Sequence, residues 1–434
     1  MLCSSRLIAF FIGISILIPP LTGNALDLQE GIKIVTEKGR DVAIARSEED
    51  AARNAVSLAR APWMPWVDLY GRETWLEHEP KVKVPVGSFP TSQDQFTTYG
   101  FKATQLLYDF GKTTSSISAA QYGLKAREAG TFRMRNRSAL EFIVAYFDLL
   151  EADELLKVAQ EEVTRYEAQR KDAAARLKAG VVTRNEVLQA EVLLADSKQR
   201  LLTAENTRAL RASRINSVLM RPLNDPVHLS ESAGNPLDPF PLEQAWAEAE
   251  QANPDLKDLD ARIRAREENV GTVRSEYLPT VFMSGGYEYS ENKYMVRPDN
   301  WTVIAGVNIN LSSGGSTGSR VGMAKSEVLS LKIGREKALD AVRIDVQTAW
   351  LDLKSSLQKV DVATTAVAQA EENLRLQRLR YKEGIGTSTE VVDAVTLMTT
   401  AETNAWKATF GVKRAEAMLQ YTMGRDLAAA YNRK

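Results

Sequence analysis

Cysteine is almost absent from this chain of 434 residues, and the single one, Cys3, lies in an N-terminal segment with the features of a secretory signal. An early Arg6, an apolar run from Leu7 to Ile18 and small residues up to Ala25 predict a signal peptide of residues 1–25. The mature chain then has no cysteine. This excludes a disulfide framework, a thiolate metal site, a cysteine nucleophile and a cysteine-borne lipid anchor.

Proline is absent from two long stretches, residues 91–221 and 299–434. Because proline breaks helices, both stretches are free to form long helices. The proline-rich segment between them, RPLNDPVHLSESAGNPLDPFP, is typical of a linker.

The sequence also lacks an excess of charge of either sign, and it lacks known catalytic motifs. The net charge is -1 and no basic run is present, so we expect no nucleic-acid partner. The sequence has no nucleophile elbow, phosphate-binding loop, HExxH motif or dinucleotide fingerprint, and its two histidines, His78 and His228, are far apart in the sequence. We therefore expect no enzyme activity, no cofactor and no metal site.

The chain contains an internal repeat. The segment RLKAGVVTRNEVLQA, beginning at Arg176, returns as RYKEGIGTSTEVVDA, beginning at Arg380, 204 positions later. The same offset relates Gly111 to Gly315, whereas Pro65 and Pro279 are 214 apart, so the first copy has ten extra residues after Pro65. An internal duplication explains both offsets.

Each copy contains the same series of elements. A short helix is followed by two strands of about ten residues with alternating polarity, such as VFMSGGYEYS, and then by a long helical hairpin. Such strands are typical of outer-membrane barrels, although a soluble amphipathic hairpin has the same pattern. The predicted divisions after the signal peptide are 26–61 (short helix), 62–108 (first β-hairpin), 109–221 (first helical hairpin, tip at 180–185), 222–241 (linker), 242–277 (short helix), 278–311 (second β-hairpin), 312–425 (second helical hairpin, tip at 384–389) and 426–434 (C-terminal tail).

The helices differ greatly in length. The first long helix, from Gly111 to about Ala179, would measure about 100 Å. The returning helix covers half that distance, so we expect a short and a returning helix, stacked end to end, to flank each long one. In the second returning helix, apolar residues step by three and four from Val391 to Leu419, which is a heptad seam. The first seam is interrupted by Arg208 and Arg211.

Four strands are too few to close a membrane barrel, because the smallest single-chain barrels use about eight. The alternating strands therefore predict that several copies pool their strands. Three copies would supply twelve strands, although the sequence itself does not fix the number three.

The duplicated plan, the YDFGKT junction and the two R-[LY]-x-x-G-x-x-[TS]-x-x-E-V turns resemble the TolC-type outer-membrane efflux channel family over essentially the whole mature chain. The resemblance implies an α+β membrane protein. Its homotrimer would form a 12-stranded β-barrel, four strands per chain, continued by a long α-helical coiled-coil barrel that extends from the outer membrane into the periplasm.

The resemblance also implies a passive exit duct of a tripartite efflux or type I secretion system. Its partners would be outer-membrane lipid, a periplasmic adaptor protein and an inner-membrane pump. The alternative is a soluble periplasmic coiled-coil adaptor or scaffold, which also has heptads and a tip but does not need the alternating strands.

The repeated turns become the periplasmic tips in this interpretation. Gly180 and Gly384 permit a left-handed turn, while Thr183 with Glu186 and Thr387 with Glu390 have the spacing of a capping box. The expected adaptor-docking residues are Gly180, Val181, Thr183, Gly384, Ile385 and Thr387.

The resemblance places a constriction at the same tips. Glu390 and Asp393 share a helix face and match its acidic positions, so three chains would supply a ring of six carboxylates that favours cations. Tyr381 and Glu186 match positions that link the two hairpins in the closed state. Gly386 occupies the position of a basic partner in the family's best-known member, so half of that link is missing.

Overall fold

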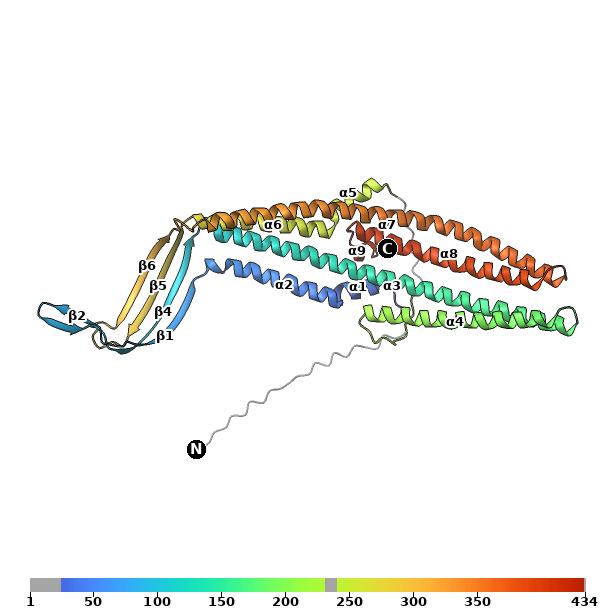
Figure 1. The fold of residues 1–434 in the computed structure, drawn as a ribbon, viewed down its shortest axis with the longest axis horizontal. Coiled ribbons are helices and arrows are strands. Elements are labelled where there is room, and N and C mark those ends of the chain that lie inside the picture. The colour runs from blue at the N-terminus through green and yellow to red at the C-terminus, as the bar shows by residue number, and fades with distance from the viewer. Residues whose placement is uncertain (1–24, 231–239, 433–434) are drawn as a thin grey trace, which may run out of the picture.

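The computed structural model describes residues 25–230 and 240–432. The predicted signal peptide, apart from its last residue, and the middle of the predicted linker lie outside the described residues. The described chain is elongated, with strands at one end and the turns of two helical hairpins at the other (Figure 1). Its elements are α1 (Leu28–Lys38), α2 (Arg40–Arg60), β1 (Trp66–Trp75), β2 (Lys81–Val84), β3 (Gly87–Pro90), β4 (Gln95–Tyr108), α3 (Lys112–Lys178), α4 (Arg184–Val218), α5 (Leu242–Ala252), α6 (Pro254–Arg274), β5 (Thr280–Ser290), β6 (Asp299–Asn308), α7 (Ser316–Lys382), α8 (Ser388–Thr422) and α9 (Leu427–Ala430).

The helices confirm the internal duplication. Both α3 and α7 have 67 residues, and both α4 and α8 have 35. Corresponding ends of these helices are 204 positions apart, while α5 and α6 follow α1 and α2 at 214. The ten extra residues of the first copy lie between β1 and β4, where the small β2–β3 hairpin has no counterpart between β5 and β6.

The short helix predicted for each copy is in fact two helices, so that part of the prediction is wrong. In the first copy the break is Gly39, whose ψ of 138° is extended, and glycine is a poor helix former. In the second copy Asn253 has a ψ of 124° because Pro254 follows it and excludes the helical conformation.

The main sheet is antiparallel, with the strand order β1-β4-β5-β6. The two copies meet where β4 pairs with β5, and there Tyr99 stacks on Tyr289 with ring centroids 5.2 Å apart. Phe101 pairs with Tyr287 and contacts Trp301 on the same face, whereas the neighbouring Lys102 and Glu288 belong to the opposite face. The predicted alternation is therefore present, and β1 and β6 each leave one edge unpaired within the described chain.

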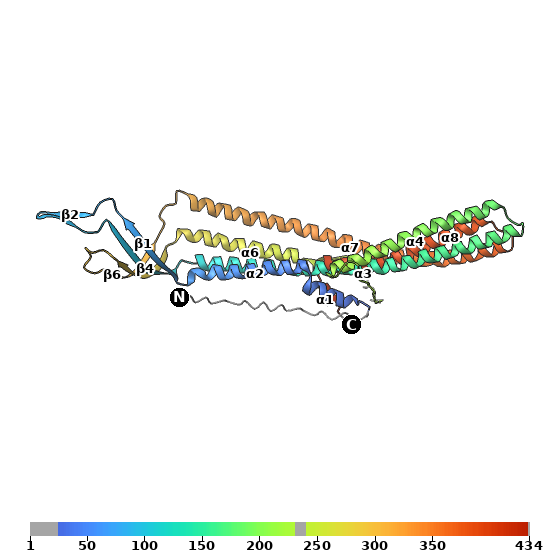
Figure 2. The ribbon, with the colours of Figure 1, turned by 90° about the horizontal axis from the view of Figure 1, so that it is seen from below.

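The long helices form a layer in which each is flanked by shorter ones. Helix α3 packs against α2 and α6 near the sheet and against α4 and α8 toward the tips, while α7 packs against α6 and then α8 (Figures 1 and 2). The end-to-end stacking expected of the short and returning helices is confirmed. Within the described ranges, no helix combines the length and apolarity needed to cross a membrane.

The seam of α8 is buried as predicted, including Val391, Ala394, Met398, Val412 and Leu419. The interruption of the first seam also has an explanation. The Nε of Arg208 lies 2.8 Å from Asp153 of α3, and Arg211 lies 3.0 Å from Asp148. Ion pairs therefore replace apolar contacts along this part of the α3–α4 hairpin.

Candidate functional site

The two helical hairpins turn in the same way at their tips. Gly180 and Gly384 have φ angles of 76° and 79°, so the left-handed conformation predicted for both is confirmed. At the first turn the Val181 N–H donates to the Arg176 carbonyl at 2.9 Å, and at the second the Ile385 N–H donates to the Arg380 carbonyl at 3.0 Å. These bonds satisfy carbonyls at the end of each long helix.

The tips present one apolar side chain each to solvent. Val181 is 64% exposed and Ile385 is 72% exposed, although both residues help to close their turns through the backbone.

The two returning helices begin differently. Thr387 and Glu390 form the predicted capping box, in which the Glu390 carboxylate accepts from the Thr387 N–H at 2.9 Å and the Thr387 hydroxyl accepts from the Glu390 N–H at 3.3 Å. The capping box predicted for Thr183 is wrong, because the Thr183 side chain accepts no capping hydrogen bond. The Glu186 carboxylate instead lies near Tyr381 of the second hairpin.

An arginine joins the two tips. The guanidinium carbon of Arg176, on α3, lies 4.3 Å from the centroid of the Tyr381 ring, on α7. The same guanidinium donates to the Lys382 carbonyl at 3.0 Å. One side chain of the first hairpin therefore contacts both a ring and a backbone group of the second.

The structure brings Tyr381 and Glu186 together. Tyr381 is only 5% exposed, and burial raises the pKa of its phenol, an effect that the Glu186 carboxylate strengthens. The Tyr381 hydroxyl and Glu186 Oε2 are both buried without a hydrogen-bond partner of standard geometry.

The two acidic residues of the expected constriction have different surroundings. The side chain of Glu390 is 40% exposed, engaged in the cap and 3.9 Å from Arg380. Asp393, one turn further along α8, is exposed, and no ion pair of the described residues includes it. Asp393 is therefore the more exposed of the two carboxylates.

Sequence reasoning did not single out Arg176 as a functional residue. The signal was present, because Arg176 and Arg380 open the two copies of the repeated turn. Only the fold distinguishes them. Arg176 contacts the other hairpin, whereas the contacts of Arg380 with Gln377 and Glu390 stay within its own.

Two long helical hairpins linked at their tips, with an open-edged antiparallel sheet at the far end, are the architecture of a TolC-type outer-membrane channel subunit. The model of the outer membrane efflux protein family matches residues 32–219 and 246–425. The chain belongs to this family. Membership places the protein in the outer membrane, with its helices in the periplasm.

Named relatives agree with this assignment. The outer membrane efflux protein BepC of Brucella suis is 22% identical over 313 residues, covering 71% of this chain and 68% of BepC. The outer membrane protein TolC of Escherichia coli is 21% identical over 458 residues, covering 98% of this chain and 89% of TolC. The open-state structure of the Neisseria gonorrhoeae MtrE outer membrane channel superposes with a TM-score of 0.76 at 19% identity, covering 92% of this chain and 89% of MtrE. The alternative of a soluble adaptor or scaffold is therefore wrong.

Proposed function

We propose that three copies of this chain form one continuous duct, a 12-stranded β-barrel followed by a helical tunnel. The observation that carries the proposal is that the outer strands of the sheet each have an unpaired edge, and that the outer strands and the outer helices expose apolar side chains. On the edge strands, Leu69 of β1 is 86% exposed and Val303 of β6 is 79% exposed. Long unpaired strands of this kind need a partner, and a closed barrel supplies one for each edge.

The edges of the helical layer support the same assembly. The outer helices α7, α2 and α4 expose Val362, Leu58 and Leu210, each at 70% or more, in grooves that these helices form with their neighbours. Because these edges lie on opposite sides of the layer, α7 of one copy meets α2 and α4 of the next. Heterologous contacts of this type close into a ring.

The duct is a passive conduit with no catalytic step, and it serves a tripartite efflux or type I secretion system. Its gate is the tip region with Glu186, Tyr381, Glu390 and Asp393, which Arg176 helps to hold closed. Three copies place three Asp393 carboxylates and three Glu390 carboxylates around the opening, and such a ring favours cations.

A periplasmic adaptor, connected to an inner-membrane pump, docks on the six tips. Val181 and Ile385 supply the apolar contacts, while Gly180, Gly384, Thr183 and Thr387 hold the turns that present them. The turns are short and ordered by backbone hydrogen bonds, which limits the entropy lost on docking.

The assembly is tested by sedimentation of the purified protein in detergent, with the mass of bound detergent subtracted. A trimer is expected for the wild type and a smaller species for Leu210→Asp, which places a charge on the α4 edge. Val181→Asp changes an equally exposed tip residue outside that edge and serves as the control. A monomeric wild type that still conducts ions would contradict the proposal.

A further inference from the structure

The hydrogen bonds and ion pairs between the two helical hairpins lie at separate levels along α3 and α8. Farthest from the tips, Arg414 of α8 pairs with Asp148 at 3.0 Å and with Glu151 at 2.7 Å. Arg165 and Glu402 form the next level, and Gln169 with Ser388 lies closer to the tips. These levels differ in the kind of contact they contain.

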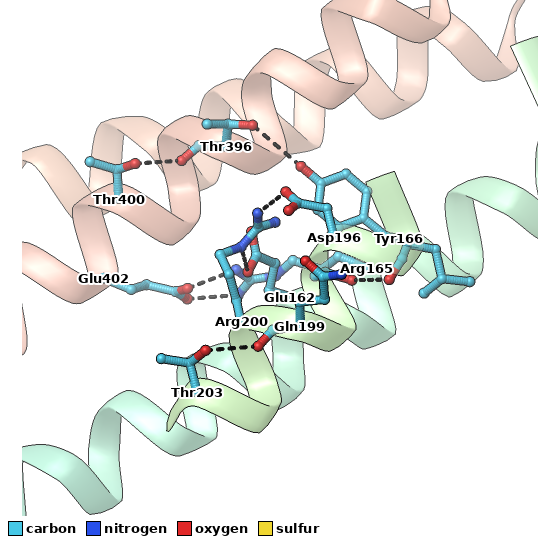
Figure 3. Close-up of polar contacts among 12 residues, drawn as sticks. Glu162, Arg165, Tyr166, Asp196, Gln199, Arg200, Thr203, Thr396, Thr400 and Glu402 are labelled. Carbon is cyan, nitrogen blue, oxygen red and sulfur yellow. Dashed lines mark hydrogen bonds and ion pairs between the residues drawn. The ribbon is translucent and has the colours of Figure 1, made fainter. Parts of the chain in front are cut away.

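The Arg165–Glu402 pair is the strongest of these contacts by geometry. Two parallel hydrogen bonds of 2.7 Å join the guanidinium to the carboxylate, and the two side chains are 14% and 15% exposed (Figure 3). A bidentate pair shielded from water in this way is both strong and orientation-specific. Its position is about 20 Å from the end of α3.

The first hairpin prepares Arg165 for this pair. Glu162, one turn away on α3, is occupied by Arg200 of α4 through two hydrogen bonds of 2.9 Å (Figure 3). Arg200 is held in turn by Asp196. Glu162 is thus paired within its own hairpin, whereas Arg165 pairs both with Glu161 of α3 at 2.8 Å and with Glu402 of the other hairpin at 2.7 Å.

Tyr166 adds an apolar anchor, which extends from this level toward the tips along α8. Its ring is 2% exposed and belongs to a core cluster whose members come from both hairpins. Its hydroxyl lies 3.3 Å from that of Thr396 on α8. The cluster contains Tyr166, Leu194, Leu374, Val392, Ala394, Val395 and Met398.

Closer to the tips, the described residues form no ion pair between the two hairpins. Gln169 donates to the Ser388 hydroxyl at 3.0 Å, and Arg176 stacks on Tyr381. The polar contacts on the tip side are therefore weaker than the bidentate pair at the Arg165–Glu402 level.

We propose that Arg165, Tyr166 and Glu402 form the hinge at which the second hairpin swings away from the first when the gate opens. The hairpins separate on the tip side of this level and stay together on the sheet side. The inference rests on the proposed gated duct and assigns Arg165 and Glu402 as positioning residues that set how wide it opens.

Crosslinks placed on either side of the hinge test the proposal. In an Arg176→Ala, Tyr381→Phe background, whose tips are released, cysteines replace either Gln169 and Ser388 or Glu151 and Arg414. A short reducible bis-methanethiosulfonate crosslinker then joins each pair in the full-length channel. The Cys-free mature sequence predicted from the signal peptide makes the reaction specific. Single-channel conductance is measured in a planar bilayer before crosslinking, after it and after reduction.

The expected result is that the Gln169/Ser388 crosslink returns the enlarged conductance to the wild-type value, reversibly, while the Glu151/Arg414 crosslink leaves it enlarged. An equal block by both crosslinks would overturn the hinge, because the hairpins would then separate along their whole length. A background conductance equal to that of the wild type would also overturn it. Failure of every variant and the wild type to form channels would instead overturn the proposed duct.

The pair itself is tested by a double-mutant cycle. Glu402→Met alone leaves Arg165 paired only with Glu161 of its own helix and removes the bidentate contact between the hairpins. The separation then moves toward the sheet, so conductance rises above that of the released-tip background. The double change Arg165→Met, Glu402→Met restores a packed contact and returns the conductance toward the background value. Glu372→Met is the matched control, because it removes an exposed ion pair with Arg375 that lies within α7 and does not join the hairpins. We expect it to leave the conductance of the background unchanged. Additive effects of the two single changes would contradict the assigned role.

Discussion

The guanidinium of Arg176 covers the ring of Tyr381 at 4.3 Å, and the two residues come from different helical hairpins. The corresponding arginine of the second copy, Arg380, contacts only its own hairpin. The duplication has therefore produced two similar turns with different tasks. The first supplies the cation that joins the tips, and the second supplies the buried ring that receives it.

Replacement of Arg176 by alanine is expected to favour the open channel. The cation–π contact and the hydrogen bond to Lys382 together contribute about 1–2 kcal/mol, so the ratio of open to closed tips rises roughly tenfold. The increase appears as a larger open probability in planar-bilayer recordings.

Arg380→Ala is the matched control, because it removes an arginine from the same position of the other repeat. Its conductance is expected to equal that of the wild type. An equal effect of the two substitutions would show that net charge at the tips, rather than the contact with Tyr381, controls opening.

Alkaline pH is expected to open the wild-type gate. The pKa of Tyr381 is raised because the phenol is buried beside Glu186, so the closed state favours the neutral ring. This advantage is fully present below pH 10 and is lost as the pH rises through the raised value. Conductance measured against pH should therefore increase above pH 10. Tyr381→Phe retains the other buried tyrosines, and a response that persists in this variant would contradict the assignment.

Cation selectivity is expected to depend more on Asp393 than on Glu390. Asp393 is exposed without an ion pair, whereas Glu390 caps α8 and lies 3.9 Å from Arg380. Reversal potentials in a salt gradient should show a larger loss of cation preference for Asp393→Asn than for Glu390→Gln. The opposite order would place Glu390, not Asp393, at the narrowest part of the duct.

The two threonine caps provide a stability test. Thr387→Ala removes a side-chain cap and is expected to destabilise the start of α8 by about 1 kcal/mol. Thr183→Ala removes a hydroxyl that makes no cap and should have little effect. Hydrogen exchange of the amides in the first turns of α4 and α8 measures both. Equal loss of protection at the two sites would contradict the asymmetry of the tips.

The repeat made much of the fold predictable. An offset of 204 residues between two Gly-centred turns fixed the equal lengths of α3 and α7, and the heptad steps of α8 identified its buried face. The breaks at Gly39 and Asn253 were missed although the sequence carried a signal for each, because glycine is a poor helix former and Pro254 excludes the helical conformation from Asn253.

The candidate site was less predictable, because its contacts join residues of different hairpins. Thr183 and Glu186 have the spacing of a capping box, but Thr183 makes no side-chain cap and the Glu186 carboxylate lies near Tyr381, almost 200 positions away. Arg176 and Arg165 look like ordinary charges on a solvated helix. Only the packing of α3 against α7 and α8 gives each of them its partner.

The most direct test of the account is single-channel conductance of the purified protein in a planar bilayer, with the wild type recorded beside a Glu390→Ser, Asp393→Ser double variant. The account predicts a small, cation-selective conductance for the wild type, and a larger, less selective one for the variant. A folded wild-type protein that forms no channels would contradict the central claim that this chain builds a gated duct.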